Sequence, residues 1–143
     1  MEPLAALAIE TAMRQGELLA LTWRDINLQQ QVARLHHTRT SAPRDVPLSR
    51  RAADILKGLP RQIGDSSPVF PLKRDNVGRK FKDACKAAGI ANLKFRDLRH
   101  KAVAYICEKL PLHEAMRVTG HKMPATLLKY YHAKDGELAQ KLG

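Results

Sequence analysis

Residues 97–109 read DLRHKAVAYICEK and form the stretch around which the remaining chain is best understood. Apolar side chains recur at helical spacing in this stretch and just beyond it, so the sequence predicts an amphipathic helix with one buried face. The inward-facing side chains are Leu98, Val103, Ile106 and Leu110. Pro111 cannot continue the helix, because its ring removes a donor and clashes with the preceding turn. Such a helix needs other elements to cover its apolar face.

Helical segments are predicted on both sides of this stretch. Ser49 is a typical N-cap and Gly58 closes the segment that follows it. Gly89 and Gly120 are typical residues just after a helix, and Pro124 suits a first turn. The predicted helices span residues 3–12, 15–21, 50–58, 75–88, 112–119, 124–131 and 135–142.

Residues 22–48 differ in character and read TWRDINLQQQVARLHHTRTSAPRDVPL. Short segments with Val, Ile, Thr and Trp are separated by polar turns, which is typical of strands. We expect a small antiparallel sheet of three short strands here, with Ser41 to Pro43 as the second turn. The fold class is therefore α+β, mainly helical with one small three-stranded antiparallel sheet.

The charge distribution indicates an anionic partner. The chain has 143 residues and a formal net charge of +11, with 16 Lys and Arg against 7 Asp and Glu in residues 73–143. So strong an excess of positive charge favours nucleic acid first and an anionic membrane surface second. The length suits one domain with its own core.

The cysteines and the ends of the chain point to a reducing compartment. Cys85 and Cys107 are too few and too isolated for a metal motif, and we expect both to be reduced core residues. No signal peptide and no stretch of transmembrane length is evident. These features predict a cytoplasmic protein that makes no membrane contact.

Three segments, one of which overlaps the start of 97–109, contain side chains suited to phosphodiester chemistry. They read TAMRQGELLALTW (11–23), KFRDLRH (94–100) and TGHKMPATLLKYYH (119–132). Arg14 and Arg99 could bind one phosphate in planar fashion, and His121 could add a hydrogen bond. The hydroxyl of Tyr130 could attack the phosphorus and retain a covalent phosphate. Individually these residues are ordinary surface or structural residues, and only their combination points to a reaction.

The three segments resemble the catalytic domain of the tyrosine recombinases, the phage-integrase family, and the resemblance extends over residues 4–142. In that family an arginine precedes a Gly-Glu-Leu turn, a second arginine lies in a Leu-Arg-His motif, and a Gly-His pair precedes the tyrosine by about nine residues. Arg14, Arg99 and His121 match these positions without a gap. The spacing from His121 selects Tyr130 as the nucleophile, and Tyr131 is expected to pack against the domain.

Two positions depart from the family pattern. Arg96 occupies the place usually given to histidine or lysine, where it can donate to a phosphate oxygen but cannot accept a proton near neutrality. Arg39 occupies the place of a lysine that protonates the leaving 5′ oxygen in the family. Arginine keeps its proton, so it could stabilise charge there but would be a poor general acid. Lys73, Lys94 or a water molecule are alternative donors.

The resemblance implies a site-specific recombinase or integrase that cleaves and rejoins double-stranded DNA through a 3′-phosphotyrosine. It implies catalytic and phosphate-contacting roles for Arg14, Arg39, Arg96, Arg99 and His121 beside Tyr130. It also implies no cofactor, neither metal nor ATP, and a bacterial or phage-encoded enzyme. Residues 1–143 would be the catalytic domain without the N-terminal DNA-clamping domain. The family assembles into tetramers on DNA through its C-terminal segment, here about 133–143, so the isolated domain is expected to be a monomer.

Two other functions remain open from the sequence. Arg39 and Arg96 are compatible with a DNA-binding relative that has little or no catalysis. A type IB topoisomerase shares this set of residues, although the interval from His121 to Tyr130 and the C-terminal form TLLKYYHAKDGELAQKLG (126–143) resemble integrases and shufflon-type invertases more. A nicked suicide substrate distinguishes a recombinase from a DNA-binding relative, because only a competent Tyr130 traps the protein covalently on DNA. Supercoil relaxation without site preference would favour the topoisomerase.

Overall fold

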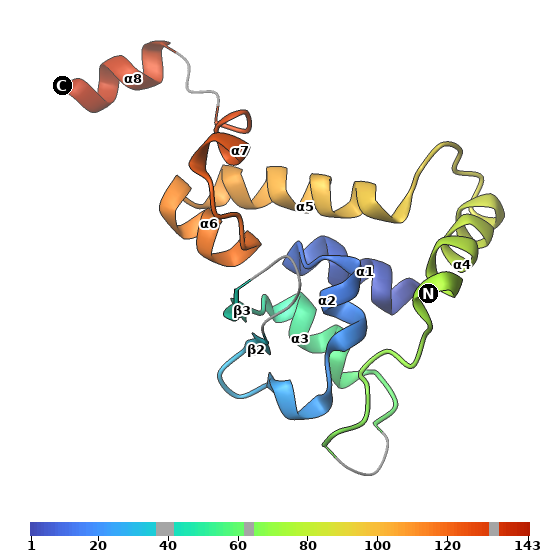
Figure 1. Ribbon diagram of the computed structural model, residues 1–143. Helices are drawn as coiled ribbons and strands as arrows, with labels where there is room; N and C mark the ends of the chain where they lie inside the picture. The colour runs from blue at the N-terminus through green and yellow to red at the C-terminus, as the bar shows by residue number, and fades with distance from the viewer. Residues whose placement is uncertain (37–41, 62–64, 132–134) are drawn as a thin grey trace.

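The computed structural model describes residues 1–36, 42–61, 65–131 and 135–143. Figure 1 shows a mainly helical molecule with one small sheet, which confirms the α+β prediction. The helices are α1 (Glu2–Thr11), α2 (Gln15–Ala20), the 3-10 helix η1 (Trp23–Asp25), α3 (Arg50–Lys57), α4 (Arg74–Ala87), α5 (Phe95–Lys109), α6 (Leu112–Thr119), α7 (Pro124–Leu128) and α8 (Asp135–Leu142). The strands are β1 (Ile26–Asn27), β2 (Val32–Leu35) and β3 (Arg44–Pro47).

The three strands form one antiparallel sheet in the order β1-β2-β3. Ala33 of β2 is paired with Val46 of β3, and both side chains are completely buried, so one face of the sheet packs on the core. Strand β1 has two residues, and just before it Asp25 accepts hydrogen bonds from the backbone and hydroxyl of Thr22 and holds η1 in a tight turn. Of the predicted second turn, Ser41 lies outside the described residues.

The core has two parts, and α5 contributes to both. The larger part joins α1, α2, the sheet, α3, α4 and the start of α5, and includes Leu7, Leu18, Val46, Leu56, Phe81 and Leu98. The smaller part joins the remainder of α5 to α6 and α7, and includes Val103, Ile106, Cys107, Ala115 and Leu127. Helix α5 therefore contributes to both parts of the core. Leu98 is its last residue in the larger part, and Arg99 follows directly.

The helix ends agree with the signals in the sequence except near the C-terminus. The hydroxyl of Ser49 accepts a hydrogen bond from the backbone of Ala52 and caps α3, and Gly120 ends α6 with a φ of 79°. The helix predicted over 124–131 stops at Leu128. Its last backbone bonds, from Tyr130 to Leu127 and from Tyr131 to Leu128, are of the tighter i→i+3 kind. The two tyrosines therefore leave α7 in a turn rather than on a continuous helix.

Two further sequence expectations can be compared with the structure. Cys85 and Cys107 are both buried and unpaired, which agrees with the prediction of reduced core residues. Among the described residues, no helix combines the length and the apolar character that crossing a membrane requires.

Candidate active site

Arg14 lies at a sharp corner between α1 and α2. Ala12 ends α1 in the left-handed conformation, with φ of 58°, and the chain turns so that Arg14 becomes the N-cap residue of α2. The backbone N–H of Arg14 donates to Glu17 Oε2 at 2.8 Å, and Arg14 Nη1 donates to Glu17 Oε1 at 3.3 Å. Glu17 thus fixes both the backbone and the side chain of Arg14, while the side chain keeps 31% of its surface exposed.

Arg44, on the edge of the sheet, is a second partner of the same carboxylate. Its Nη1 lies 2.7 Å from Glu17 Oε1 and its Nη2 lies 3.1 Å from Glu17 Oε2, so the pair is bidentate. Burial acts to raise the pKa of Glu17, but hydrogen bonds from Arg44 and the Arg14 backbone, with the charges of both arginines, lower it overall. Glu17 is therefore an ionised carboxylate inside the protein, only 3% exposed. The sequence analysis assigned no role to Glu17 or Arg44.

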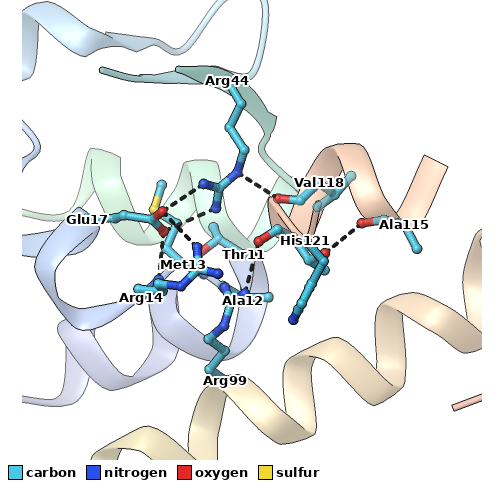
Figure 2. A network of polar contacts seen from close by, with 11 residues as sticks. Thr11, Ala12, Met13, Arg14, Glu17, Arg44, Arg99, Ala115, Val118 and His121 are labelled. Atoms are coloured by element: carbon cyan, nitrogen blue, oxygen red, sulfur yellow. Dashed lines mark hydrogen bonds and ion pairs between the residues drawn. The ribbon is translucent and has the colours of Figure 1, made fainter. Parts of the chain in front are cut away.

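Arg99 joins the corner after α1 to the end of α6. Its Nη1 donates to the carbonyl oxygen of Ala12 and its Nη2 donates to that of Thr119 at 3.0 Å. Burial first, and then the positive charge of Arg14, lower the pKa of Arg99 to about 10. Arg99 is thus still cationic at neutral pH, and its guanidinium carries more N–H donors than these two carbonyls use. Figure 2 shows Arg14, Arg44 and Arg99 reaching toward one region from three different elements.

His121 follows the glycine that ends α6 and lies on the other side of this region (Figure 2). Its Nδ1 is 2.7 Å from the hydroxyl of Thr119, which in turn donates to the carbonyl oxygen of Ala115 at 3.0 Å. Because that hydroxyl has a single proton, we assign the Nδ1–H of His121 as the donor, which leaves Nε2 at the far end of the ring. Burial and the neighbouring cations, Arg99 foremost, lower the pKa of His121 to about 4.

The two tyrosines have different surroundings. The hydroxyl of Tyr131 donates to the carbonyl oxygen of Leu110 at 2.9 Å, and burial raises its pKa to about 12. Tyr130 packs partly against the smaller core, with Lys129 Nζ 5.3 Å from its ring centroid. The charge of ionised Tyr130 acts on the pKa of Arg99, so this phenol lies within electrostatic reach of the guanidinium. Tyr131 is thus committed to a structural hydrogen bond, as the sequence led us to expect.

Of the remaining two candidates, Arg96 lies among the described residues, and no bond joins it to this network. Arg96 is exposed on the first turn of α5, where it lines a surface hollow together with Gln15 and Phe81. It lies one helical turn before Arg99 on the same helix, and the structure gives it no bond to the other candidates. Arg39, the candidate in the lysine position, lies outside the described residues.

The arrangement is suited to binding one singly or doubly charged anion. Two guanidinium groups, from Arg14 and Arg99, present N–H donors beside the imidazole of His121 in a partly buried setting, where such donors act strongly. Among the described residues, no cluster of three or more His, Cys, Asp and Glu side chains that could hold a metal ion is found.

Comparison with known proteins identifies the family. Residues 3–137 match the Phage integrase family. A shufflon-specific DNA recombinase of Escherichia coli is 38% identical over 138 residues, which cover 95% of this chain and 35% of that protein. The integrase of Salmonella phage P22 is 24% identical over 163 residues, covering 97% of this chain and 41% of that protein. The chain spans 35% to 45% of the length of such curated relatives.

Solved structures show the same fold. The Tn1549 transposon integrase in complex with a circular intermediate DNA superposes with a TM-score of 0.80 at 15% identity, over 98% of this chain and 57% of that one. The XerA recombinase superposes with a TM-score of 0.73 at 20% identity, over 98% and 60% of the two chains. The chain belongs to the phage integrase family, the tyrosine recombinases, and has the fold of their catalytic domain.

Proposed function

We propose that residues 1–143 are the strand-cleaving and strand-joining part of a site-specific DNA recombinase, with Tyr130 as the nucleophile. The observation that supports this most is the convergence of Arg14, Arg99 and His121 on one region, held by partly buried hydrogen bonds, with Tyr130 within electrostatic reach of Arg99. These side chains come from segments far apart in the sequence, and each has its own structural anchor. In the proposed complex, DNA places the scissile phosphate on these donors and within reach of the hydroxyl of Tyr130.

The proposed reaction has a simple chemical basis. The negative oxygens of a phosphodiester repel a nucleophile, and Arg14 and Arg99 would neutralise them and stabilise the charge that builds in the five-coordinate transition state. The Tyr130 oxygen forms a bond to phosphorus as the bond to the 5′ oxygen breaks, which gives a 3′-phosphotyrosine. A DNA 5′ hydroxyl then reverses the step. Arg96 would add a donor to the phosphate, and Arg39 would stabilise the leaving oxygen.

We further propose that this cycle needs neither a metal ion nor ATP. Each transfer exchanges one phosphodiester-type bond for another, so the bond energy is retained in the phosphotyrosine. The positive charge that a metal ion would otherwise bring to the phosphate is provided by the arginine side chains of the site. Cleavage at an unchanged rate in the presence of EDTA, and without nucleotide, is the expected result. A requirement for added Mg²⁺ would contradict the proposal.

Double-stranded DNA is the proposed substrate and partner. The excess of positive charge in residues 73–143 implies several phosphate contacts, each releasing about 0.9 counterion. Binding should therefore weaken steeply as salt is raised, and a flat salt titration would count against DNA. We also propose that the isolated protein is a monomer that assembles into a tetramer only on DNA. The exposed residues Leu138 and Leu142 of α8 fit a C-terminal segment that docks on a neighbouring copy.

The deciding experiment uses a suicide substrate, a DNA duplex with a nick near the cleavage site. After cleavage the short fragment diffuses away, and the protein stays covalently attached to DNA. We expect an adduct whose tryptic phosphopeptide contains Tyr130. DNA binding without any adduct would instead indicate a non-catalytic DNA-binding relative. Relaxation of supercoiled DNA at many sites would indicate a topoisomerase-like enzyme.

A further inference from the structure

Arg44 connects three separate parts of the candidate site. From β3 its Nη1 and Nη2 bind the two oxygens of Glu17, and its Nε donates to the carbonyl oxygen of Val118, in the last turn of α6, at 3.2 Å. Its side chain is 9% exposed, so these bonds lie largely out of water. Figure 2 shows the guanidinium between Glu17 on one side and the end of α6 on the other.

The shape of the guanidinium explains why arginine is needed here. It is planar and rigid, and its edges donate in different directions within one plane. One edge meets the carboxylate of Glu17, and Nε serves the carbonyl of Val118. A lysine ammonium carries the same charge, but it is a point donor on a flexible stem and cannot hold both partners in a fixed geometry.

Gly120 shows how closely Arg44 approaches the chain next to His121. A Cβ added at Gly120 would lie 2.6 Å from Arg44 Nη1 and 2.7 Å from its Cζ, so the guanidinium would have to move away from its present partners. Gly120 also has a φ of +79°, which favours glycine by itself. Gly89 has a similar φ of +74° but open space around the same position. The contact with Arg44 is therefore an additional requirement at Gly120.

We infer that Arg44 is a positioning residue, which holds Arg14, through Glu17, and the turn that carries His121 at a fixed distance from each other. The inference rests on the proposed cleavage reaction for its consequence, although the contacts themselves do not depend on it. Arg44 need not touch the phosphate. It determines whether the two sides of the phosphate-binding region face the same point, and misplacement by about 1 Å can slow such chemistry about 10²-fold.

The charge of Arg44 also acts on His121. The charged groups that act on this imidazole from the surrounding elements are Arg99 on α5, Arg14 before α2, Arg44 on β3 and Lys129 after α7, and all four are cations. Together with burial they lower the pKa of His121. Removing the charge of Arg44 should therefore let His121 keep its proton to a higher pH, a change that a structural role remote from His121 would not produce.

The test compares Arg44→Lys and Arg44→Gln with the control Arg34→Gln. Arg34 lies on the neighbouring strand and forms an exposed ion pair with Asp45 at 3.0 Å. The control variant therefore removes a comparable arginine–carboxylate pair that is not part of the site. The measurements are the melting temperature, the rate of covalent adduct formation at saturating DNA, DNA affinity, and the pKa of His121 by NMR titration. We expect Arg44→Lys to slow the saturated rate about 10²-fold with little change in DNA affinity. Arg44→Gln should raise the pKa of His121, and Arg34→Gln should change none of these quantities.

A second comparison tests the contact without requiring activity. Gly120→Ala should lower the melting temperature more than Gly89→Ala, because both add strain at positive φ but only the first meets Arg44. When Gly120→Ala is combined with Arg44→Gln, the additional loss of melting temperature at position 120 should become smaller, because the guanidinium that the new Cβ meets is gone. If Arg44→Gln does not fold, Arg44→Lys and the glycine pair of single variants still decide the matter.

The outcomes separate this inference from the proposed function. Wild-type adduct formation in a folded Arg44→Lys protein would overturn the positioning role while leaving the recombinase proposal intact. A loss of stability in the Arg44 variants with an unchanged saturated rate would overturn it as well. If the wild-type protein forms no adduct, the proposed function fails, and the glycine variants decide alone. Equal losses of melting temperature in Gly120→Ala and Gly89→Ala would then overturn the contact that the positioning role requires, and a larger loss at Gly120 that shrinks in Arg44→Gln would support it.

Discussion

The phosphate-binding side chains and the nucleophile are held in very different ways. Arg14 and Arg99 are anchored by buried carbonyls, by Glu17 and by helix ends, and His121 is held by the hydroxyl of Thr119. Tyr130 instead follows a five-residue helix, α7, in which Leu127 is the one buried residue, and α8 beyond it is exposed and stands away from the remainder of the chain (Figure 1). The binding region is built into the core, whereas the nucleophile is carried by a segment with little packing.

This difference fits the chemistry that we propose. Electrostatic stabilisation of a transition state is strongest where donors are fixed before the reaction and shielded from water. A nucleophile needs only to reach the phosphorus, and a lightly packed segment allows it to be placed by DNA or by a neighbouring copy.

Tyr130→Phe should abolish covalent attachment to the suicide substrate and leave DNA affinity nearly unchanged, because it removes the attacking oxygen but no phosphate donor. The assay is adduct formation on a denaturing gel, with affinity measured in parallel. The matched control is Tyr131→Phe, which should still form the adduct and lose about 1 kcal/mol of stability with its bond to Leu110. Loss of the adduct in Tyr131→Phe alone would mean that the register from His121 is wrong.

A substrate with a 5′-bridging sulfur should be cleaved about 10²–10⁴-fold faster than the ordinary oxygen substrate. The thiolate leaves without a proton, whereas the oxygen needs one that Arg39, as a guanidinium, cannot readily give. Arg39→Lys should raise the rate on the oxygen substrate, or leave it unchanged if another group already donates. Equal wild-type rates on the two substrates, with chemistry rate-limiting, would show that proton donation is not deficient.

Arg99→Ala should lower the saturated cleavage rate by about 10²–10³-fold, the usual effect of removing a preorganised donor. It should also destabilise the fold, because the carbonyls of Ala12 and Thr119 lose a shared partner. Cleavage rate and melting temperature are measured together. Arg96→Ala is the comparison, and it should have a smaller effect on both because Arg96 is exposed. Equal losses in the two variants would mean that burial does not distinguish them.

The stability of the binding region should fall as the pH is lowered from 6.5 to 4. The pKa of His121 is about 4 in the folded protein against an ordinary 6.5, so in this window the unfolded chain takes up a proton that the folded chain does not. The contribution is present above pH 6.5, and we expect a loss of about 1–2 kcal/mol after allowance for partial exposure. Glu17, whose pKa is lowered, adds a further loss that begins as the pH falls through its ordinary pKa of 4.5.

Urea unfolding at a series of pH values measures this slope, and His121→Gln is its control. The variant should unfold with a nearly constant free energy between pH 6.5 and about 5.5, above the range in which the carboxylates begin to contribute. A wild-type protein with the same flat profile would contradict the depressed pKa and the cationic surroundings that explain it.

Deletion of residues 135–143 should have the smallest effect on the isolated protein. The described side chains of α8 are exposed, so their removal should change the free energy of unfolding by less than about 0.5 kcal/mol. The same deletion should weaken assembly on DNA if α8 docks on a neighbour. A large loss of stability in the monomer would show that the C-terminal segment supports the domain after all.

The sequence predicted the elements well because their signals are local. Ser49, Gly58, Pro111 and Gly120 mark helix ends through their own backbone preferences, and the apolar spacing of 97–109 identified the helix that joins both parts of the core. The end of α7 was missed because no local signal marks it: Lys129 and Tyr130 are compatible with a helix, and the packing of Tyr131 on Leu110 is a tertiary contact.

The sequence by itself determined the fold class, the family and the candidate residues Arg14, Arg99, His121 and Tyr130, since residue type and spacing are sufficient for these. Only the tertiary structure revealed Glu17 and Arg44 as the pair that joins the sheet to the binding region. A carboxylate and an arginine 27 positions apart look like two solvated charges until folding buries them against each other. Burial also decided that His121 is neutral near pH 7, because desolvation and nearby cations exist only once the elements have packed.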